Sequence, residues 1–106
     1  MAKYMIQASY TQAGVQGVLK EGGSSRRDAI AGLLAGLGGG LEGFYFAFGD
    51  DDVFVIADLP DNITAAAIGL TVAAAGAVSS RTVVLLTPEE VDAATKKSVD
   101  YRPPGA

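Results

Sequence analysis

The chain has 106 residues, 49% of them hydrophobic, and its eight Lys and Arg against twelve Asp and Glu give a formal net charge of -4. This length supports a single domain over residues 1–106, and the acidic balance argues against nucleic-acid binding by counterion release. The chain contains no Cys and no His, which excludes disulfides, thiol catalysis, and the commonest general base and metal ligand. We therefore expect no nucleic-acid partner, no metal site and no cofactor.

The first predicted element is a strand, because residues 3–10 alternate between two unlike sets of side chains. One set is Tyr4, Ile6, Ala8 and Tyr10, and the other is Lys3, Met5, Gln7 and Ser9. A helical crossover in two parts is predicted next. Thr11 can cap a short helix that Gly22 and Gly23 end or bend, and a second amphipathic helix continues until Gly38.

Two further strands are predicted at residues 41–48 and 52–59. Only Gly49 and the aspartates separate them, which predicts a hairpin. Pro60 ends the second strand of this hairpin, because proline cannot donate a hydrogen bond to a sheet.

The segment from Asn62 to Ser80 has no charged residue and predicts a helix capped by Asn62. It is rich in Ala, Gly, Thr and Ser, so its transfer into a bilayer is too weakly favourable for a membrane span. The amino terminus also lacks the pattern of a signal peptide. We therefore expect a cytoplasmic protein with no membrane partner.

The carboxyl-terminal part predicts a strand over residues 81–87, which Pro88 ends, and a helix over residues 88–97 with Glu89 and Glu90 near the positive end of its dipole. The element order is therefore β-α-β-β-α-β plus a short terminal helix. This order predicts the ferredoxin-like α+β sandwich, in which a four-stranded antiparallel sheet carries both long helices on one face.

The other face of this sheet is the main functional prediction. The first strand is expected beside the third and antiparallel to it, which brings Lys3 near Asp58. The same face then also carries Met5, Gln7, Phe54 and Ile56. Since apolar side chains on such a face need cover, and a second copy of the chain can supply it, we expect a homo-oligomer with Met5, Phe54 and Ile56 in its interface.

Three segments carry a resemblance that covers essentially the whole chain: YTQAGVQGVLKEGGSSRR, FGDDDVFVIADLPDN and LLTPEEVDAATKKSVDYRPPG. Together they resemble the GYD-domain family of small bacterial proteins. The glycine, tyrosine and aspartate segment that names the family falls on Gly49 to Asp52, where Asp51 stands in place of the usual tyrosine. The resemblance implies a ferredoxin-like fold related to the dimeric α+β barrels, and it implies no particular reaction.

The three aspartates after Gly49 have two interpretations. In the first, Asp50 and Asp51 form a tight turn and Asp52 begins the next strand. In the second they bind a cation, but the alternating ligands and distant Glu of a calcium loop are absent. We favour the turn, and we keep Asp52 as a ligand-binding candidate near the rim of the sheet.

The segment GGSSRRD places glycines, serines and two arginines at a helix start, which are the ingredients of an anion site. The spacing of a phosphate-binding Walker loop is absent, and the alternative is that Arg26 and Arg27 pair with Asp28 or other surface acids. Both arginines remain anion-binding candidates.

Two classes of function remain. The first is a non-catalytic homo-oligomer that binds a small apolar or aromatic molecule, oriented by Gln7, Ser9 or Tyr45, or that serves as an assembly or regulatory unit. The second is a cofactor-free enzyme of the oxygenase or isomerase type, with a dry cavity between paired sheets and Asp52 or Asp58 as the base. We favour the first class, because the chain has no His to act as a base.

Overall fold

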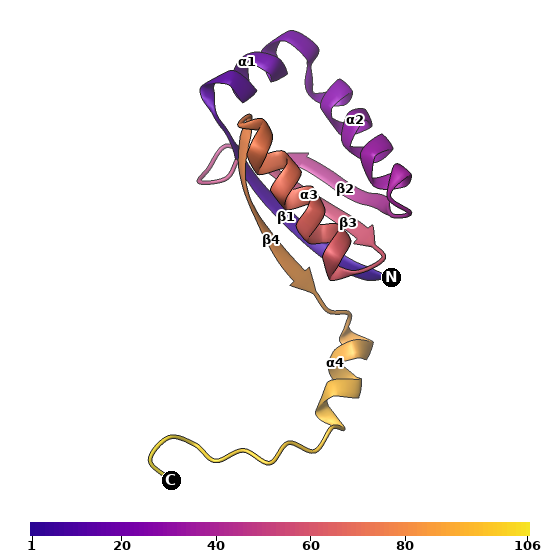
Figure 1. Ribbon diagram of the computed structural model, residues 1–106, viewed down its shortest axis with the longest axis vertical. Coiled ribbons are helices and arrows are strands. Elements are labelled where there is room, and N and C mark those ends of the chain that lie inside the picture. The colour runs from indigo at the N-terminus through magenta and orange to yellow at the C-terminus, as the bar shows by residue number, and fades with distance from the viewer.

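A computed structural model describes residues 1–106 as four strands and four helices (Figure 1). In chain order these are β1 (Ala2–Tyr10), α1 (Gln12–Glu21), α2 (Gly23–Gly36), β2 (Gly40–Phe46), β3 (Val53–Leu59), α3 (Asn62–Ala75), β4 (Val78–Leu85) and α4 (Pro88–Thr95). The predicted order of elements is confirmed, with the first helical crossover divided into α1 and α2.

The four strands form one antiparallel sheet in the order β2-β3-β1-β4, which is a ferredoxin-like arrangement. β1 lies beside β3 and Lys3 is paired with Asp58, as the sequence predicts. Both α2 and α3 lie on one face of the sheet, α2 over β2 and α3 over β4 (Figure 1). The predicted α+β sandwich is therefore confirmed.

The helical crossover is divided by Gly22, whose φ of 85° lies in the left-handed region that favours glycine. Thr11 caps α1, because its hydroxyl accepts a hydrogen bond from the backbone N–H of Gly14, at 3.3 Å. The same Gly14 lies against the end of α3, and a Cβ atom there would be 2.1 Å from the carbonyl oxygen of Ala77. Glycine therefore lets the start of α1 approach the α3–β4 connection closely.

α3 differs from the prediction at both ends. Its N-cap is Asp61 rather than Asn62, because the Asp61 carboxylate accepts hydrogen bonds from the backbone N–H and the hydroxyl of Thr64. Asn62 instead accepts a hydrogen bond from the hydroxyl of Tyr4. The helix ends at Ala75, well before Ser80, because Gly76 forms a left-handed C-cap with a φ of 77°.

The strand boundaries also correct the prediction. β2 ends at Phe46 and β3 begins at Val53, so residues 47–52 form a loop that is longer than the predicted tight turn. Phe48 lies in this loop and is fully exposed, instead of ending a strand. β4 begins at Val78 rather than Arg81, since the residues after Gly76 leave the helix and join β1.

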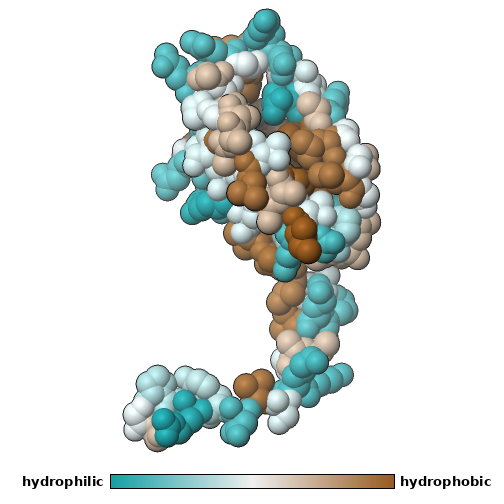
Figure 2. All heavy atoms as spheres, in the orientation of Figure 1, coloured by the Kyte–Doolittle hydropathy of each residue, from teal (hydrophilic) through white to brown (hydrophobic).

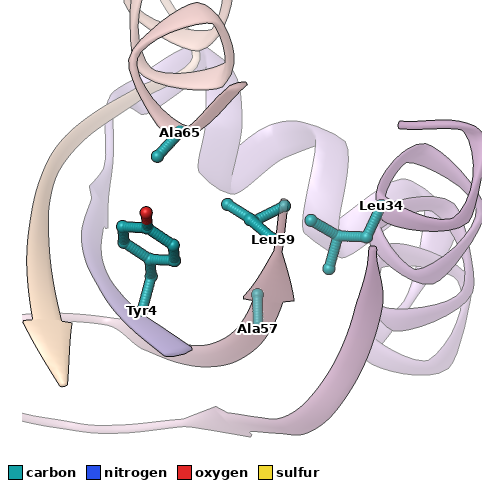
Figure 3. Close-up of a cluster of buried hydrophobic side chains, with 5 residues drawn as sticks. All are labelled: Tyr4, Leu34, Ala57, Leu59 and Ala65. Carbon is teal, nitrogen blue, oxygen red and sulfur yellow. The ribbon is translucent and has the colours of Figure 1, made fainter. Parts of the chain in front are cut away.

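The hydrophobic core lies between the sheet and the helices. Its larger cluster comprises Tyr4, Leu34, Ala57, Leu59 and Ala65. Figure 3 shows these side chains converging from β1, α2, β3 and α3. A second cluster comprises Ala8, Val53 and Val55. The strand residues in both clusters belong to one side of the sheet, which confirms the predicted division into a helix-covered face and an open face.

α4 and the residues that follow it extend away from the rest of the chain (Figure 1). Thr87 and Glu90 form a reciprocal capping box at the start of α4, and every residue from Pro88 to Ala106 is exposed. The radius of gyration is 16.8 Å, whereas a compact domain of this length has about 13 Å. We call residues 86–106 the carboxyl-terminal arm, and call the rest of the chain the body.

Candidate functional site

The open face is the side of the sheet opposite α2 and α3. In its central row Ile56 is paired with Met5, and Met5 is paired with Val83. From β2 to β4, the next row reads Tyr45, Phe54, Gln7 and Arg81. Along β3 the residues on the helix side are buried and those on the open face are only half-buried. The predicted interface residues Met5, Phe54 and Ile56 thus lie together in the middle of an uncovered surface.

A charged cluster lies at one end of the open face. Lys3 Nζ is 2.7 Å from Glu42 Oε2 and 2.9 Å from Asp58 Oδ1. The hydrogen bonds to Glu42 and then to Asp58 raise the pKa of the Lys3 ammonium above its ordinary value. Asp58 therefore pairs with a cation of its own chain in this cluster.

At the other end, two aspartates of the 47–52 loop hold separate strands. Asp51 Oδ2 accepts a hydrogen bond of 2.7 Å from Arg81 Nη2 on β4. Asp52 Oδ2 accepts one of 2.8 Å from the backbone N–H of Tyr10 on β1. No group of three or more His, Cys, Asp or Glu is arranged to hold a metal ion. The contacts of these carboxylates agree with a structural role for the loop, although the loop is not the tight turn predicted.

The structure does not bring the predicted ligand-binding residues into one site. They are Gln7, Ser9, Tyr45, Asp52 and Asp58. Gln7 and Tyr45 lie on either side of Phe54 in one row of the open face. Ser9 lies with Asp52 near the loop, and its hydroxyl donates to the carbonyl oxygen of Asp50, at 3.1 Å. Asp58 lies at the opposite end, so only Gln7 and Tyr45 accompany the apolar centre.

The two candidate arginines of α2 have different surroundings. Arg27 Nε donates a hydrogen bond of 3.1 Å to Asp28 Oδ1 on the surface, which is the alternative considered from the sequence. Arg26 is less exposed, and its one ion-pair partner, Glu21, lies 3.9 Å away, beyond hydrogen-bond distance. Arg26 also lines a cleft on the helix side of the sheet.

This cleft is the feature that sequence reasoning missed. It lies between α2 and α3, has a volume of about 90 Å³, and is lined mainly by hydrophobic side chains. Figure 2 views the helix side and shows hydrophobic atoms at the surface between these two helices. The depth of the cleft depends on the distance between α2 and α3, and no sequence pattern predicts that distance. The one feature of the sequence that could have indicated the cleft is Gly69, a glycine in the interior of α3 that lines it.

Comparison with known proteins matches the chain to one described family. The family model described as GYD domain matches residues 4–95, a range that includes nearly all of β1 and every other helix and strand. No curated protein and no solved structure matches the chain. None of the helices combines the length and the apolar character that a membrane crossing requires.

Proposed function

The chain belongs to the GYD domain family, and we propose that it functions as a homo-oligomer whose open sheet faces pack together. Its role is non-catalytic: it binds a small apolar or aromatic molecule, or it serves as an assembly or regulatory unit. One observation carries this proposal, the apolar centre of the open face, which no element of the chain covers.

The centre of the open face has the composition of a contact surface. Met5, Ile56 and Phe54 are only half-buried, and the neighbouring Val83 is 40% exposed. Exposed apolar patches that are rimmed by polar residues commonly mark interaction sites. A second copy presents the same patch, so a two-fold axis would match the two patches to each other.

The charged residues of the open face support the same proposal. Lys3 is paired with Glu42 and Asp58 at one end, and Arg81 is paired with Asp51 at the other. An apolar centre with polar groups around it is the usual anatomy of a protein interface. Because these charges already have partners in their own chain, packing two open faces together leaves few charges without a partner.

A small ligand would lie between the paired sheets. Gln7 and Tyr45 flank Phe54, and Tyr45 is 68% exposed. An amide and a phenol beside an apolar surface can orient a small apolar or aromatic molecule by hydrogen bonds. The enzymatic alternative is less well supported, because the carboxylates of Asp52 and Asp58 already accept hydrogen bonds from Tyr10 and Lys3.

The oligomer is tested by placing a charge in the centre of the open face. We expect Phe54→Asp to dissociate the oligomer into folded monomers, because a carboxylate there cannot be buried against its own copy without a large desolvation cost. Light scattering after gel filtration gives the mass, and circular dichroism shows whether the monomer is folded.

The matched control is Leu19→Asp, which places the same charge on α1, where Leu19 is 81% exposed. This variant should keep the mass of the wild-type protein. If Phe54→Asp also keeps that mass, the open face is not the interface.

The ligand is tested on the wild-type oligomer. Native mass spectrometry of the purified protein, followed by denaturation and identification of what is released, would reveal a bound small molecule. An apolar or aromatic compound supports the ligand-binding role, whereas an empty oligomer supports the assembly or regulatory role.

A further inference from the structure

The cleft between α2 and α3 lies on the opposite side of the sheet from the open face. We propose that it binds a small amphipathic anion, whose apolar part lies between the helices and the sheet and whose carboxylate or similar group pairs with Arg26. This site is separate from the homo-oligomer interface, so the two proposals can fail independently.

The cleft has the lining that an apolar group needs, and a hollow beside it adds the volume. Ile6, Val55, Ile30 and Ile68 are among the hydrophobic side chains around its volume of about 90 Å³. A second hollow of about 240 Å³ adjoins it towards α1, and both are lined by Arg26 and Val72. An apolar cavity of about 150 Å³ is sufficient to bind benzene. The two hollows together therefore have room for an aromatic ring or a short aliphatic chain.

A glycine in the interior of a helix lines the cleft. Gly69 lies in the interior of α3 among many alanines, although glycine is less favourable than alanine at such a position. A Cβ atom on Gly69 would meet no other atom within 4 Å, so no steric contact requires the glycine. Gly17 of α1 lines the second hollow, and the space around it is equally open. Neither position therefore places a side chain in the hollow that it lines.

Arg26 gives the cleft its preference for an anion. It is the only charged residue that lines the main hollow, and it also lines the second hollow, where Glu21 is the other charged residue. The other arginines of the body, Arg27 and Arg81, each hydrogen-bond to an aspartate, whereas Glu21 lies 3.9 Å from Arg26. Arg26 is also in the first part of α2, whose N-terminus has no side-chain cap and carries the positive end of the helix dipole. A guanidinium in this position can bind a carboxylate with two hydrogen bonds.

The test measures the binding of two probes to the full chain by isothermal titration calorimetry. 4-Phenylbutyrate has an apolar body and a carboxylate, and 4-phenylbutanol replaces the carboxylate with a neutral hydroxyl group. We expect both to bind the wild-type protein with one site per chain, with the anion at least tenfold tighter. Failure of 4-phenylbutyrate to bind, or equal affinity for both probes, would overturn the proposal.

Two substitutions separate the charge from the volume. Arg26→Gln should weaken 4-phenylbutyrate at least tenfold and leave 4-phenylbutanol nearly unchanged. Gly69→Leu should abolish the binding of both, because its side chain fills the cleft. Unaltered binding in either variant would overturn the assignment of that residue and with it the site.

The matched control for Gly69→Leu is Gly32→Leu. Gly32 is an exposed glycine of α2 with open space around it, and it does not line the cleft. This control should bind both probes as the wild-type protein does. Both leucine variants should melt at no lower temperature than the wild-type protein, since leucine favours helix. A lower melting temperature for Gly69→Leu alone would show that the cleft is already filled.

Discussion

Both faces of the sheet carry large apolar side chains, but only one face is covered by helices. On β3, Val53, Val55, Ala57 and Leu59 are buried beneath the helices. Phe54 and Ile56 alternate with them and remain half-buried on the open face. A strand that alternates between buried and solvated faces normally presents polar residues to water. One face of this sheet is therefore left without cover within a single chain.

The largest expected effect lies on the covered face. Leu34 is 1% exposed between α2 and the sheet, and Leu34→Ala should lower the free energy of unfolding by about 2–5 kcal/mol, because it leaves a cavity in the core. Leu37, at the end of the same helix, is 43% exposed, and Leu37→Ala should cost less than about 1 kcal/mol. Urea unfolding measures both. Equal losses would mean that the covered face is not the principal core.

The next largest effect is the dependence of stability on protein concentration, which tests the open face. If the oligomer is a dimer, its unfolding includes dissociation, and a tenfold dilution should lower the stability by about 1.4 kcal/mol per dimer. Thermal unfolding of the wild-type protein at several concentrations measures this shift. The Phe54→Asp variant should unfold at one temperature whatever its concentration. A wild-type melting temperature that does not change with protein concentration would argue against the interface.

A smaller effect compares one tyrosine from each face. Tyr4 is 1% exposed and donates a hydrogen bond to Asn62, so Tyr4→Phe should destabilise the protein by about 1 kcal/mol. Tyr45 is 68% exposed on the open face, and Tyr45→Phe should leave the stability of the Phe54→Asp monomer unchanged. Chemical denaturation of both tyrosine variants in that monomeric background makes the comparison direct. Similar losses at both positions would remove the distinction between the faces.

The smallest effect is a pH dependence of stability that arises at Asp61, the N-cap of α3 on the covered face. The backbone N–H and then the hydroxyl of Thr64 lower the pKa of Asp61 below its ordinary 3.8. Because the folded-state pKa is depressed, the stabilisation by Asp61 is complete above the unfolded value and is lost as the pH falls through the folded value. The wild-type protein should therefore lose stability relative to Asp61→Asn as the pH falls through 3.8 and then through the lower folded-state pKa, which urea unfolding at a series of pH values measures.

The arm supplies a matched control for this titration. The backbone N–H and the side chain of Thr87 similarly lower the pKa of Glu90 in the capping box of α4. Since α4 does not pack on the body, Glu90→Gln should change the helicity of the arm and leave the main unfolding transition in place. A shift of that transition would show that the arm is coupled to the body.

Much of the fold could be predicted because its signals are local. The alternation around Tyr4 and Ile6 identifies the two faces of β1, and antiparallel pairing then brings Lys3 to Asp58. The end of α3 is harder to predict, because residues 77–80 are uncharged and resemble the helix in composition. Only Gly76 marks the boundary. The sequence places Phe48 in a strand for a similar reason, because an aromatic residue next to a strand gives no sign that the pairing has ended.

The candidate sites were less predictable, because they depend on how distant elements meet. The open face follows from strand order, so Met5, Phe54 and Ile56 could be grouped from the sequence. The pairing of Arg81 with Asp51 requires the loop to reach β4, and the cleft beside Arg26 requires the separation of α2 from α3. No periodic pattern in the sequence predicts the distance from the loop to β4 or the distance from α2 to α3.

The native mass of the wild-type protein shows directly whether two open faces pack together, and sedimentation equilibrium over a wide range of concentrations measures it. The open face, if it is an interface, predicts an even multiple of the 10.8 kDa chain mass, with dissociation only on strong dilution. A mass of one chain at every concentration would contradict the proposed oligomer, because the apolar centre of the sheet would then be a free surface.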